Sequence, residues 1–157
     1  MKLTEVISRK AILLGIKSTN KKAVLTELVT ALKKACDGEK FTVNEAVDAV
    51  LEREKVGSTG LGGGVAVPHA KLGTVRGVVG AFGRCANGVD FNSVDGEPVN
   101  LVFLVLAPPQ KNDDYLAALQ KTMKAIKQPN LCKFLRAAKS AKEIEDIFRE
   151  LEEAAKV

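Results

Sequence analysis

Residues 53–71 read Arg53-Glu54-Lys55-Val56-Gly57-Ser58-Thr59-Gly60-Leu61-Gly62-Gly63-Gly64-Val65-Ala66-Val67-Pro68-His69-Ala70-Lys71. This stretch contains the only histidine of the 157-residue chain and five glycines within eight positions. Glycine has no Cβ atom, so a glycine-rich turn lets backbone N–H groups converge on a small anion. The segment 65–67 predicts a short strand that Pro68 ends, because proline cannot extend a central ladder. We therefore expect His69 at a strand end, where the chain leaves the sheet and the imidazole faces a cleft.

Two interpretations of His69 follow from residue types alone. A ring nitrogen of histidine can accept a phosphoryl group, and an arginine nearby, with backbone amides, would hold the transferring oxygens. The alternative is a histidine that is hydrogen-bonded at the end of a strand, with the glycines only making a turn. Both stay open at this point, because a lone histidine carries no information about its partners.

A longer pattern surrounds this histidine. Its matching positions are Arg53, Glu54, Gly57, Ser58, Thr59, Gly60, Gly62, Gly64, Ala66, Pro68, His69 and Lys71. They resemble the run R-E-x-x-G-S-T-G-x-G-x-G-x-A-x-P-H-A/G-[KR] of the enzyme IIA components of the fructose–mannitol type in the bacterial phosphotransferase system. That run carries the phosphorylated histidine of the family. The similarity extends over nearly the whole chain, including residues 99–108 and the C-terminal helices.

The resemblance implies a role for each matching residue. His69 would take the phosphoryl group on Nε2 while a backbone carbonyl holds its other ring nitrogen. Arg53 would bind the phosphoryl oxygens, because a guanidinium can bind two of them at once and a lysine cannot. The implied phosphate-binding set is Ser58, Thr59, Gly60 and Gly62. Glu54 is an accessory residue, which we interpret first as a helix-end carboxylate rather than as a catalytic base.

One position departs from the family pattern. Many members carry a second histidine in an H-L-x-x-L segment early in the helix after the long central strand. The equivalent stretch here begins with Tyr115, which we therefore count as a second accessory residue. A phenol can donate one hydrogen bond to a phosphate oxygen, but it carries no positive charge. We expect phosphoryl acceptance to survive this change and leave open its effect on transfer rate or on the stability of the phospho-state.

The resemblance implies two functions. The first is a regulatory switch of the free-standing, nitrogen-related branch, whose phospho-state changes its binding to other proteins. The second is a sugar-specific component that passes phosphate to a IIB domain during uptake. The sequence shows no fused B or membrane domain, which favours the switch. In both cases the implied donor is an HPr-like phosphocarrier, and regulated target proteins or a IIB domain would follow it. No cofactor or metal is expected.

Composition limits the other classes. The chain has 46% hydrophobic residues, a net charge of +5 and an aromatic content of 4% without tryptophan. Base-stacking platforms are therefore poorly supplied, and we interpret lysines such as Lys21 and Lys33 as solvated helix surface rather than a nucleic-acid site. There is no membrane-length apolar run and no signal peptide, so a cytoplasmic location is expected. The loop lacks the lysine of a Walker A motif and the third glycine of a dinucleotide fingerprint.

Periodicity predicts the elements around the loop. A short helix or turn and a short strand are expected over 3–16. Residues 18–20 cap a helix that Asp37-Gly38 ends, and Thr42 to Glu45 form a capping box for a helix whose last turn holds Arg53. A strand over 75–82 should precede turns at Asn87-Gly88 and Asp95-Gly96. Residues 99–106 predict a fully buried central strand.

Helices are expected again in the last third of the chain. Asn112-Asp113 should cap a helix that buries Leu116, Leu119, Met123 and Ile126 and that Pro129 breaks. A short helix through residues 131–135 and a last helix capped by 140–143 should follow, with Ile144, Ile147, Phe148 and Leu151 facing inward. Because strands and helices interleave, we predict an α/β fold: a single domain over residues 1–157 with a mixed β-sheet flanked by helices on both faces.

Overall fold

Strand β6 (Val99–Ala107) lies at the centre of the fold in a computed structural model that describes residues 2–36 and 38–154. Every residue of β6 except Asn100 is buried. Successive side chains of a strand point to opposite faces, so β6 contributes to two separate cores. Val102, Leu104 and Leu106 belong to one core, and Leu101, Phe103 and Val105 belong to the other. The predicted fully buried central strand is confirmed.

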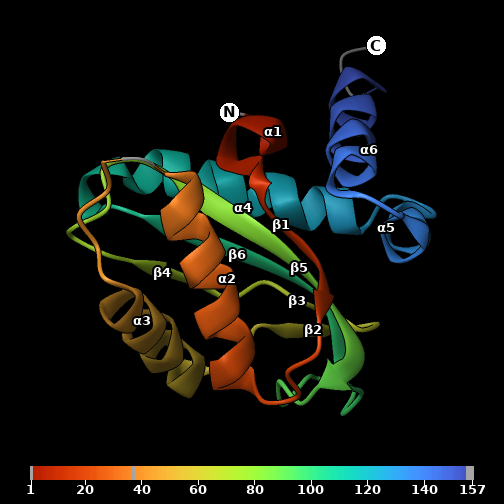
Figure 1. The fold of residues 1–157 in the computed structure, drawn as a ribbon, viewed down its shortest axis with the longest axis horizontal. Coiled ribbons are helices and arrows are strands. Elements are labelled where there is room, and N and C mark those ends of the chain that lie inside the picture. Colours follow the sequence, from red (N-terminus) through yellow and green to blue (C-terminus); the bar gives the residue numbers. More distant parts are fainter. Residues whose placement is uncertain (1, 37, 155–157) are drawn as a thin grey trace.

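The sheet extends to both sides of β6 (Figure 1). Within the described residues the strand order is β1-β5-β6-β3-β2, and β4 also pairs with β6. Strand β5 runs antiparallel to β6, whereas β3 and β4 run parallel to β6 and β1 runs parallel to β5. The predicted mixed sheet is therefore confirmed. The other strands span Ile7–Ile16 (β1), Gly60–Gly62 (β2), Val65–Ala66 (β3), His69–Lys71 (β4) and Val79–Val89 (β5).

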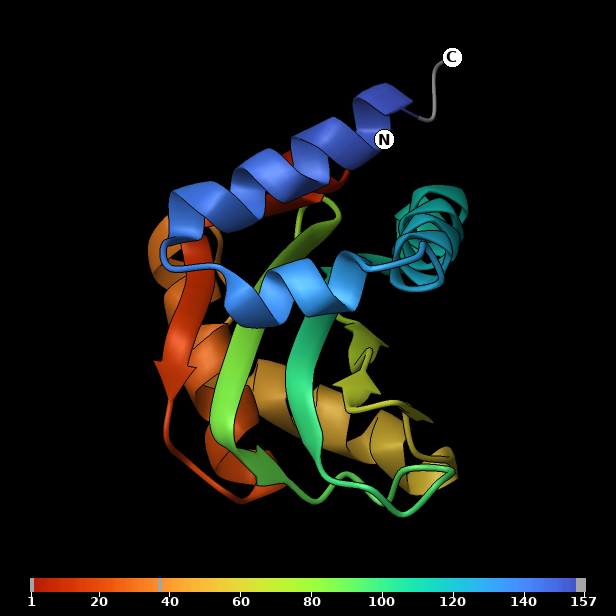
Figure 2. The same cartoon turned by 90° about the vertical axis from the view of Figure 1, so that its right-hand side faces the viewer.

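Helices cover both faces of this sheet, as predicted (Figure 2). One face packs against α2 (Lys21–Ala35) and α3 (Val43–Val56), which share a core with alternate residues of β6. The opposite face packs against the remaining helices, where Phe82 packs edge to face against both Phe103 and Phe148. These helices are α1 (Leu3–Val6), α4 (Asn112–Ile126), α5 (Leu131–Ala137) and α6 (Ala141–Ala154), with a 3-10 turn η1 (Pro109–Lys111) before α4.

Three of the expected helix caps are present. The Asn20 side chain accepts a hydrogen bond from the amide of Ala23, and Thr42 accepts one from the amide of Glu45. The Ser140 hydroxyl accepts one from the amide of Glu143. Each bond satisfies an N–H group that has no partner within its helix. Of the expected stop at Asp37-Gly38, residue 37 lies outside the described part of the chain, and α2 ends at Ala35.

Strand β5 differs from its predicted extent. It begins at Val79 rather than at residue 75, and it continues through Asn87 and Gly88 to Val89. The expected turn at Asn87-Gly88 is therefore wrong. These residues lie instead in an irregular part of the β5–β6 pairing, where the register shifts between Arg84 and Val89 and Gly88 has φ of +73°. A bulge uses the left-handed conformation that glycine tolerates, and its sequence signal is the same as that of a turn.

The buried face of α4 is shifted from the predicted one: Leu119, Met123 and Ile126 are partly buried and pack against the core, but the most deeply buried residues are others. Tyr115, Ala118, Thr122 and Ala125 are its buried residues, and Leu116 is 47% exposed. Asn112 and Asp113 do not cap the helix either, because η1 leads into it directly. Similarly, β1 is a ten-residue strand where a short one was expected.

None of the helices in the described residues is long and apolar enough to cross a membrane.

The close packing of strands predicts a large effect of a methyl group at Gly80. This residue pairs with Ile7 on one side and Val105 on the other, and a Cβ atom there would lie 2.7 Å from the carbonyl oxygen of Leu104. Backbone cannot move aside within a sheet, so we expect Gly80→Ala to lower the free energy of unfolding by about 1–3 kcal/mol, measured by urea denaturation.

Gly15→Ala is the matched control for this substitution. Gly15 lies in β1, and a Cβ atom there would have no heavy atom within 4 Å. Its unfolding free energy should stay within about 0.5 kcal/mol of the wild type. Equal effects of the two substitutions would contradict the packing described for β5.

Candidate functional site

His69 is placed by two short strands that both pair with β6. Val65 in β3 pairs with Leu101, and His69 in β4 pairs with Val105, both in parallel register. Pro68 lies between the two strands, and its carbonyl accepts a hydrogen bond from the amide of Val105 at 3.0 Å. We expected the chain to leave the sheet at His69, and this expectation is wrong. The histidine stands at a strand end, but at the beginning of β4, where the chain rejoins the sheet.

A main-chain carbonyl holds one ring nitrogen of His69. Its Nδ1 lies 2.7 Å from the carbonyl oxygen of Val67. A carbonyl can only accept a hydrogen bond, so Nδ1 carries the proton and Nε2 keeps its lone pair. Burial lowers the pKa of His69 below its ordinary value; the bond to Val67 opposes that shift, and the nearby charge of Arg53 adds to it. The ring is therefore neutral at pH 7, with Nε2 as a nucleophile.

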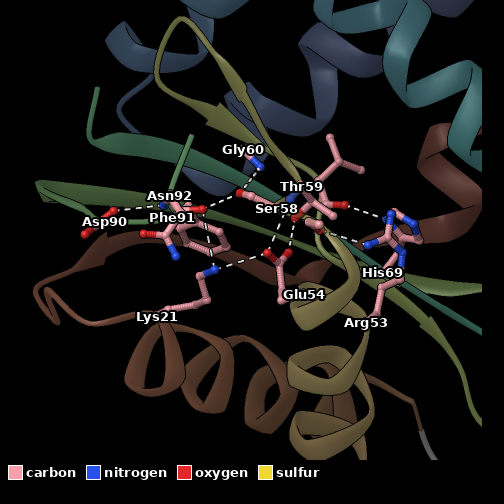
Figure 3. Close-up of polar contacts among 12 residues, drawn as sticks. Lys21, Arg53, Glu54, Ser58, Thr59, Gly60, His69, Asp90, Phe91 and Asn92 are labelled. Carbon is pink, nitrogen blue, oxygen red and sulfur yellow. Dashed lines mark hydrogen bonds and ion pairs between the residues drawn. The ribbon is translucent and has the colours of Figure 1, made fainter. Parts of the chain in front are cut away.

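Arg53 reaches this site from the last turn of α3. Its Nη1 donates a hydrogen bond of 2.9 Å to the carbonyl of Gly57, which follows the helix directly. Figure 3 shows the guanidinium beside the imidazole of His69. The charge of Arg53 also acts on both rings: it adds to the lowering of the His69 pKa by burial and opposes the raising of the Tyr115 pKa by burial. Arg53 thus lies near enough for its charge to act on both His69 and Tyr115.

Tyr115 is the residue of α4 that lies next to His69. Its ring centroid lies 6.0 Å from that of His69 with a tilt of 57°. Burial raises the pKa of Tyr115 to about 12, with the charge of Arg53 opposing the shift. The phenol therefore keeps its proton at neutral pH. Its hydroxyl makes no hydrogen bond within the described residues, which leaves one donor available beside the imidazole.

Glu54 points the opposite way from Arg53, into the protein (Figure 3). Its carboxylate forms an ion pair of 3.1 Å with Nζ of Lys21 and accepts hydrogen bonds from the amide and the hydroxyl of Thr59. The side chains of Lys21 and Glu54 are only 17% and 4% exposed. Buried charges need such partners, so Glu54 anchors the loop. The interpretation of Lys21 as solvated surface was wrong.

The hydroxyls expected in the anion pocket are engaged elsewhere. Ser58 donates to the carbonyl of Phe91, and its oxygen accepts a hydrogen bond of 3.0 Å from the amide of Gly60. Thr59 donates to Glu54. A hydroxyl has one hydrogen, so neither hydroxyl has a hydrogen left for an anion on His69 in this structure. His69, Arg53 and Tyr115 are brought together, whereas Ser58 and Thr59 tie the loop to its surroundings.

The glycines after residue 59 build a hairpin between β2 and β3. Gly60 and Gly62 lie in β2, paired with Ala66 and Val65. Gly62, Gly63 and Gly64 have φ values of +91°, +66° and +80°, which residues with a Cβ atom rarely adopt. At the tip, the amide of Gly63 donates to Asp95, and its carbonyl accepts a hydrogen bond of 2.6 Å from Arg136 of α5.

Three contributors were missed by reasoning from the sequence. Lys21 and Phe91 lie far from the loop in sequence, and Nζ of Lys21 sits 5.0 Å from the centroid of the Phe91 ring. Lys71 was noted only as a matching position, but its Nζ lies 5.6 Å from the centroid of the Tyr115 ring. No local pattern could have revealed these contacts.

In the described part of the chain, no group of acidic, cysteine and histidine residues could hold a metal ion.

Comparisons with known proteins point in one direction. The family model described as "Phosphoenolpyruvate-dependent sugar phosphotransferase system, EIIA 2" matches residues 5–151. A nitrogen regulatory protein of Bradyrhizobium diazoefficiens is 37% identical over 94% of this chain and 95% of its own. A fructose-specific EIIABC component of Bacillus subtilis is 39% identical over 96% of this chain, which spans only 23% of that protein. The crystal structure of the nitrogen regulatory protein IIA-Ntr from Neisseria meningitidis superimposes with a TM-score of 0.85 at 31% identity, covering 93% of this chain and 98% of that one.

The environment of His69 predicts its titration. His69 is the only histidine, so its ring gives a single set of NMR signals, and we expect their midpoint below pH 6.5. The free energy that neutral His69 contributes to folding is then fully present above pH 6.5, the approximate pKa of a histidine in the unfolded chain. It is lost as the pH falls through the lower pKa that His69 has in the folded protein. Arg53→Gln should raise the midpoint, because a nearby positive charge disfavours the imidazolium. The control is Lys55→Met, which removes a positive charge from the exposed face of α3 and should leave the midpoint unchanged. A midpoint above pH 6.5 in the wild type would contradict the burial of His69.

The buried ion pair predicts a second measurable effect. Lys21→Met keeps the length of the side chain but leaves the Glu54 carboxylate without its cation, so the free energy of unfolding should fall by about 3 kcal/mol. The exposed pair between Lys55 and Glu52, whose side chains are 72% and 71% exposed, provides the control. Lys55→Met should leave stability nearly unchanged, because water already screens that pair. Chemical denaturation of both variants would test this, and a mild effect at Lys21 would show that Glu54 is solvated.

Proposed function

The chain belongs to the phosphoenolpyruvate-dependent sugar phosphotransferase system EIIA type 2 family, and on that premise we propose that it is a phosphohistidine carrier. It accepts a phosphoryl group on Nε2 of His69 from an HPr-like protein. The observation that carries this proposal is the bond of 2.7 Å between Nδ1 of His69 and the carbonyl of Val67. That bond leaves Nε2 unprotonated and turned away from the backbone, as a nucleophile must be.

The transfer step is a displacement at phosphorus. The lone pair of Nε2 forms a bond to the phosphorus as the bond between phosphorus and the ring nitrogen of the carrier breaks, and the carrier nitrogen keeps that electron pair. Each ring retains the proton on its other nitrogen, so only the phosphoryl group moves. On His69 this proton stays on Nδ1, in the bond to Val67. Positioning and charge neutralisation are the main tasks left to the protein.

Arg53 is the group that neutralises the transferring phosphoryl. In the absence of phosphate its Nη1 is bonded to the carbonyl of Gly57, a neutral acceptor. Bonds from a guanidinium to a phosphoryl group are stronger than bonds to a carbonyl, because both partners are charged. We therefore assign Arg53 a move from Gly57 to the phosphoryl oxygens. The phosphate-binding candidates remain Ser58, Thr59, Gly60 and Gly62. To bind phosphate, the Ser58 hydroxyl would have to give up its bond to Phe91, the Thr59 hydroxyl its bond to Glu54 and the Gly60 amide its bond to Ser58.

The surface around the loop suits a protein donor. Val56 is 84% exposed at the end of α3, and Leu61 is 39% exposed in the hairpin. Large apolar side chains that are exposed to solvent are common where another protein docks. We propose that the HPr-like carrier covers these residues during transfer, which would also exclude water from the reacting phosphoryl group.

We propose a regulatory role as the main function downstream of His69. The likeness to the nitrogen regulatory proteins supports it, since both the sequence and the fold match over more than nine tenths of this chain. Phosphorylation would add about −1.5 to −2 charges beside the end of α3 and change which target proteins bind there. The alternative is transfer to a IIB domain during sugar uptake, which the match to a fructose-specific EIIABC component supports. Either role places the protein in the cytoplasm.

Intact-mass spectrometry tests the carrier function directly. After incubation with phosphoenolpyruvate, enzyme I and an HPr-type carrier, we expect one acid-labile phosphate on the wild type and none on His69→Ala. Arg53→Lys should be labelled at least about tenfold more slowly, because an ammonium cannot bind two phosphoryl oxygens in the same plane.

A known enzyme IIA labelled in parallel serves as the positive control. An unlabelled wild type beside a labelled control would overturn the proposal. Labelling of Tyr115→His in that case would show that transfer requires a second imidazole at this position. Loss of the label on addition of a IIB domain would favour the uptake role. Retention of the label, with altered binding to other proteins, would favour the regulatory role.

A further inference from the structure

Lys71 lies on the same face of the sheet as His69. The two residues are separated by one position in β4, and side chains two apart along a strand point to the same side. Ala70 between them is buried in the core beneath α2 and α3. His69 and Lys71 therefore face the other layer, which contains α4.

Tyr115 of α4 contacts both of these side chains. The Nζ atom of Lys71 lies 5.6 Å from the centroid of the Tyr115 ring, and the imidazole centroid lies 6.0 Å from the same point. A cation at that distance is attracted by the negative face of the ring. The Lys71 side chain is exposed, and its ammonium has no carboxylate partner within the described residues. It is a cation held near His69 by a weak contact.

A phosphoryl group on His69 needs more positive charge than Arg53 supplies. It would bring about −1.5 to −2 charges to a half-buried ring, and buried charge is costly unless it is paired. The charges that act on His69 are those of Arg53 and Glu54 from α3, and Glu54 is turned into the protein. Lys71 of β4 contacts the same Tyr115 ring that lies beside His69, and the contact of α4 with His69 is this neutral phenol. Glu54 is already paired with Lys21. Lys71 is therefore the remaining cation on this side.

We propose that Lys71 is the second cation of the phosphohistidine site, and that its ammonium moves from the face of Tyr115 onto a phosphoryl oxygen when His69 is phosphorylated. The inference rests on the proposed function of His69. The lysine ammonium is a compact charge on a flexible four-carbon chain, so it can make this move without a change in the backbone. Lys71 would then supply from β4 the positive charge that Tyr115 cannot supply from α4, while the phenol donates one hydrogen bond.

The test compares four variants with the wild type, using phosphoramidate as a small phosphoryl donor that needs no carrier. Lys71→Met and Lys71→Gln remove the charge, Lys71→Arg keeps it, and Lys124→Met removes a charge of the same kind from the exposed part of α4. We expect the two uncharged variants to be phosphorylated on His69 roughly fivefold more slowly at low salt. The other two should match the wild type, and the difference should shrink at high salt because the interaction is screened.

The ³¹P NMR titration of the phosphorylated proteins gives a second readout that a purely structural role would not move. A cation beside the phosphoryl group favours its dianion, so its second pKa should be higher in Lys71→Met than in the wild type or in Lys71→Arg. Unchanged rates and titrations in both uncharged variants would overturn the proposal, as would equal losses in Lys71→Met and Lys71→Arg. Labelling of the wild type by phosphoramidate but not by an HPr-type carrier would overturn the proposed donor alone. Failure of both donors to label His69 would overturn both proposals.

Discussion

The geometry of the site depends on the pairing of β6 with two short strands across Pro68. Because β3 and β4 share one neighbour, the residues between them cannot shift along the sheet without breaking both registers. This fixes the carbonyl of Val67 against Nδ1 of His69. The tautomer of His69 is thus selected by a main-chain carbonyl. In the Ser-His-Asp triad, by contrast, a carboxylate holds Nδ1 of the histidine. A carbonyl orients the ring without adding negative charge, which suits the proposed acceptance of a phosphoryl group by His69.

The adjacent residues Arg53 and Glu54 have opposite tasks because consecutive residues of a helix point in different directions. Arg53 reaches the site, and Glu54 enters the protein, where it is paired with Lys21 and bonded to Thr59. The same ammonium lies near Phe91, whose carbonyl receives the Ser58 hydroxyl. One buried cation therefore joins the start of α2, the end of α3 and the segment after β5. The cost of burying Lys21 is offset by its ion pair with Glu54 and its hydrogen bond to the carbonyl of Phe91.

The charge of the site comes from two cations beside two neutral rings, and this has a consequence for the proposed function. Burial keeps the imidazole and the phenol of Tyr115 uncharged at pH 7, while the two nearby cations are held by weak acceptors, the carbonyl of Gly57 and the ring of Tyr115. Both contacts are easily exchanged for an incoming anion. The arrival of a phosphoryl group would therefore rearrange side chains from α3 and β4 together, and a partner protein docked over the loop would detect the change.

The sequence by itself determined the parts that depend on local chemistry. The apolar run of β6, the caps at Asn20, Thr42 and Ser140, and the motif around His69 are all encoded by neighbouring residues, and the structure or the family match bears out the fold and family that they predict. Only the tertiary structure decided the rest: that Asn87-Gly88 is a bulge, that α4 buries Tyr115 instead of Leu116, that Thr59 bonds to Glu54, and that Lys21 and Lys71 reach the site. The physical reason is that a local pattern sets which conformations a segment can adopt, whereas burial and ion pairing depend on residues that are distant in sequence. A lysine has the same local signal on a solvated helix as beside a buried carboxylate, and only the fold brings the carboxylate to it.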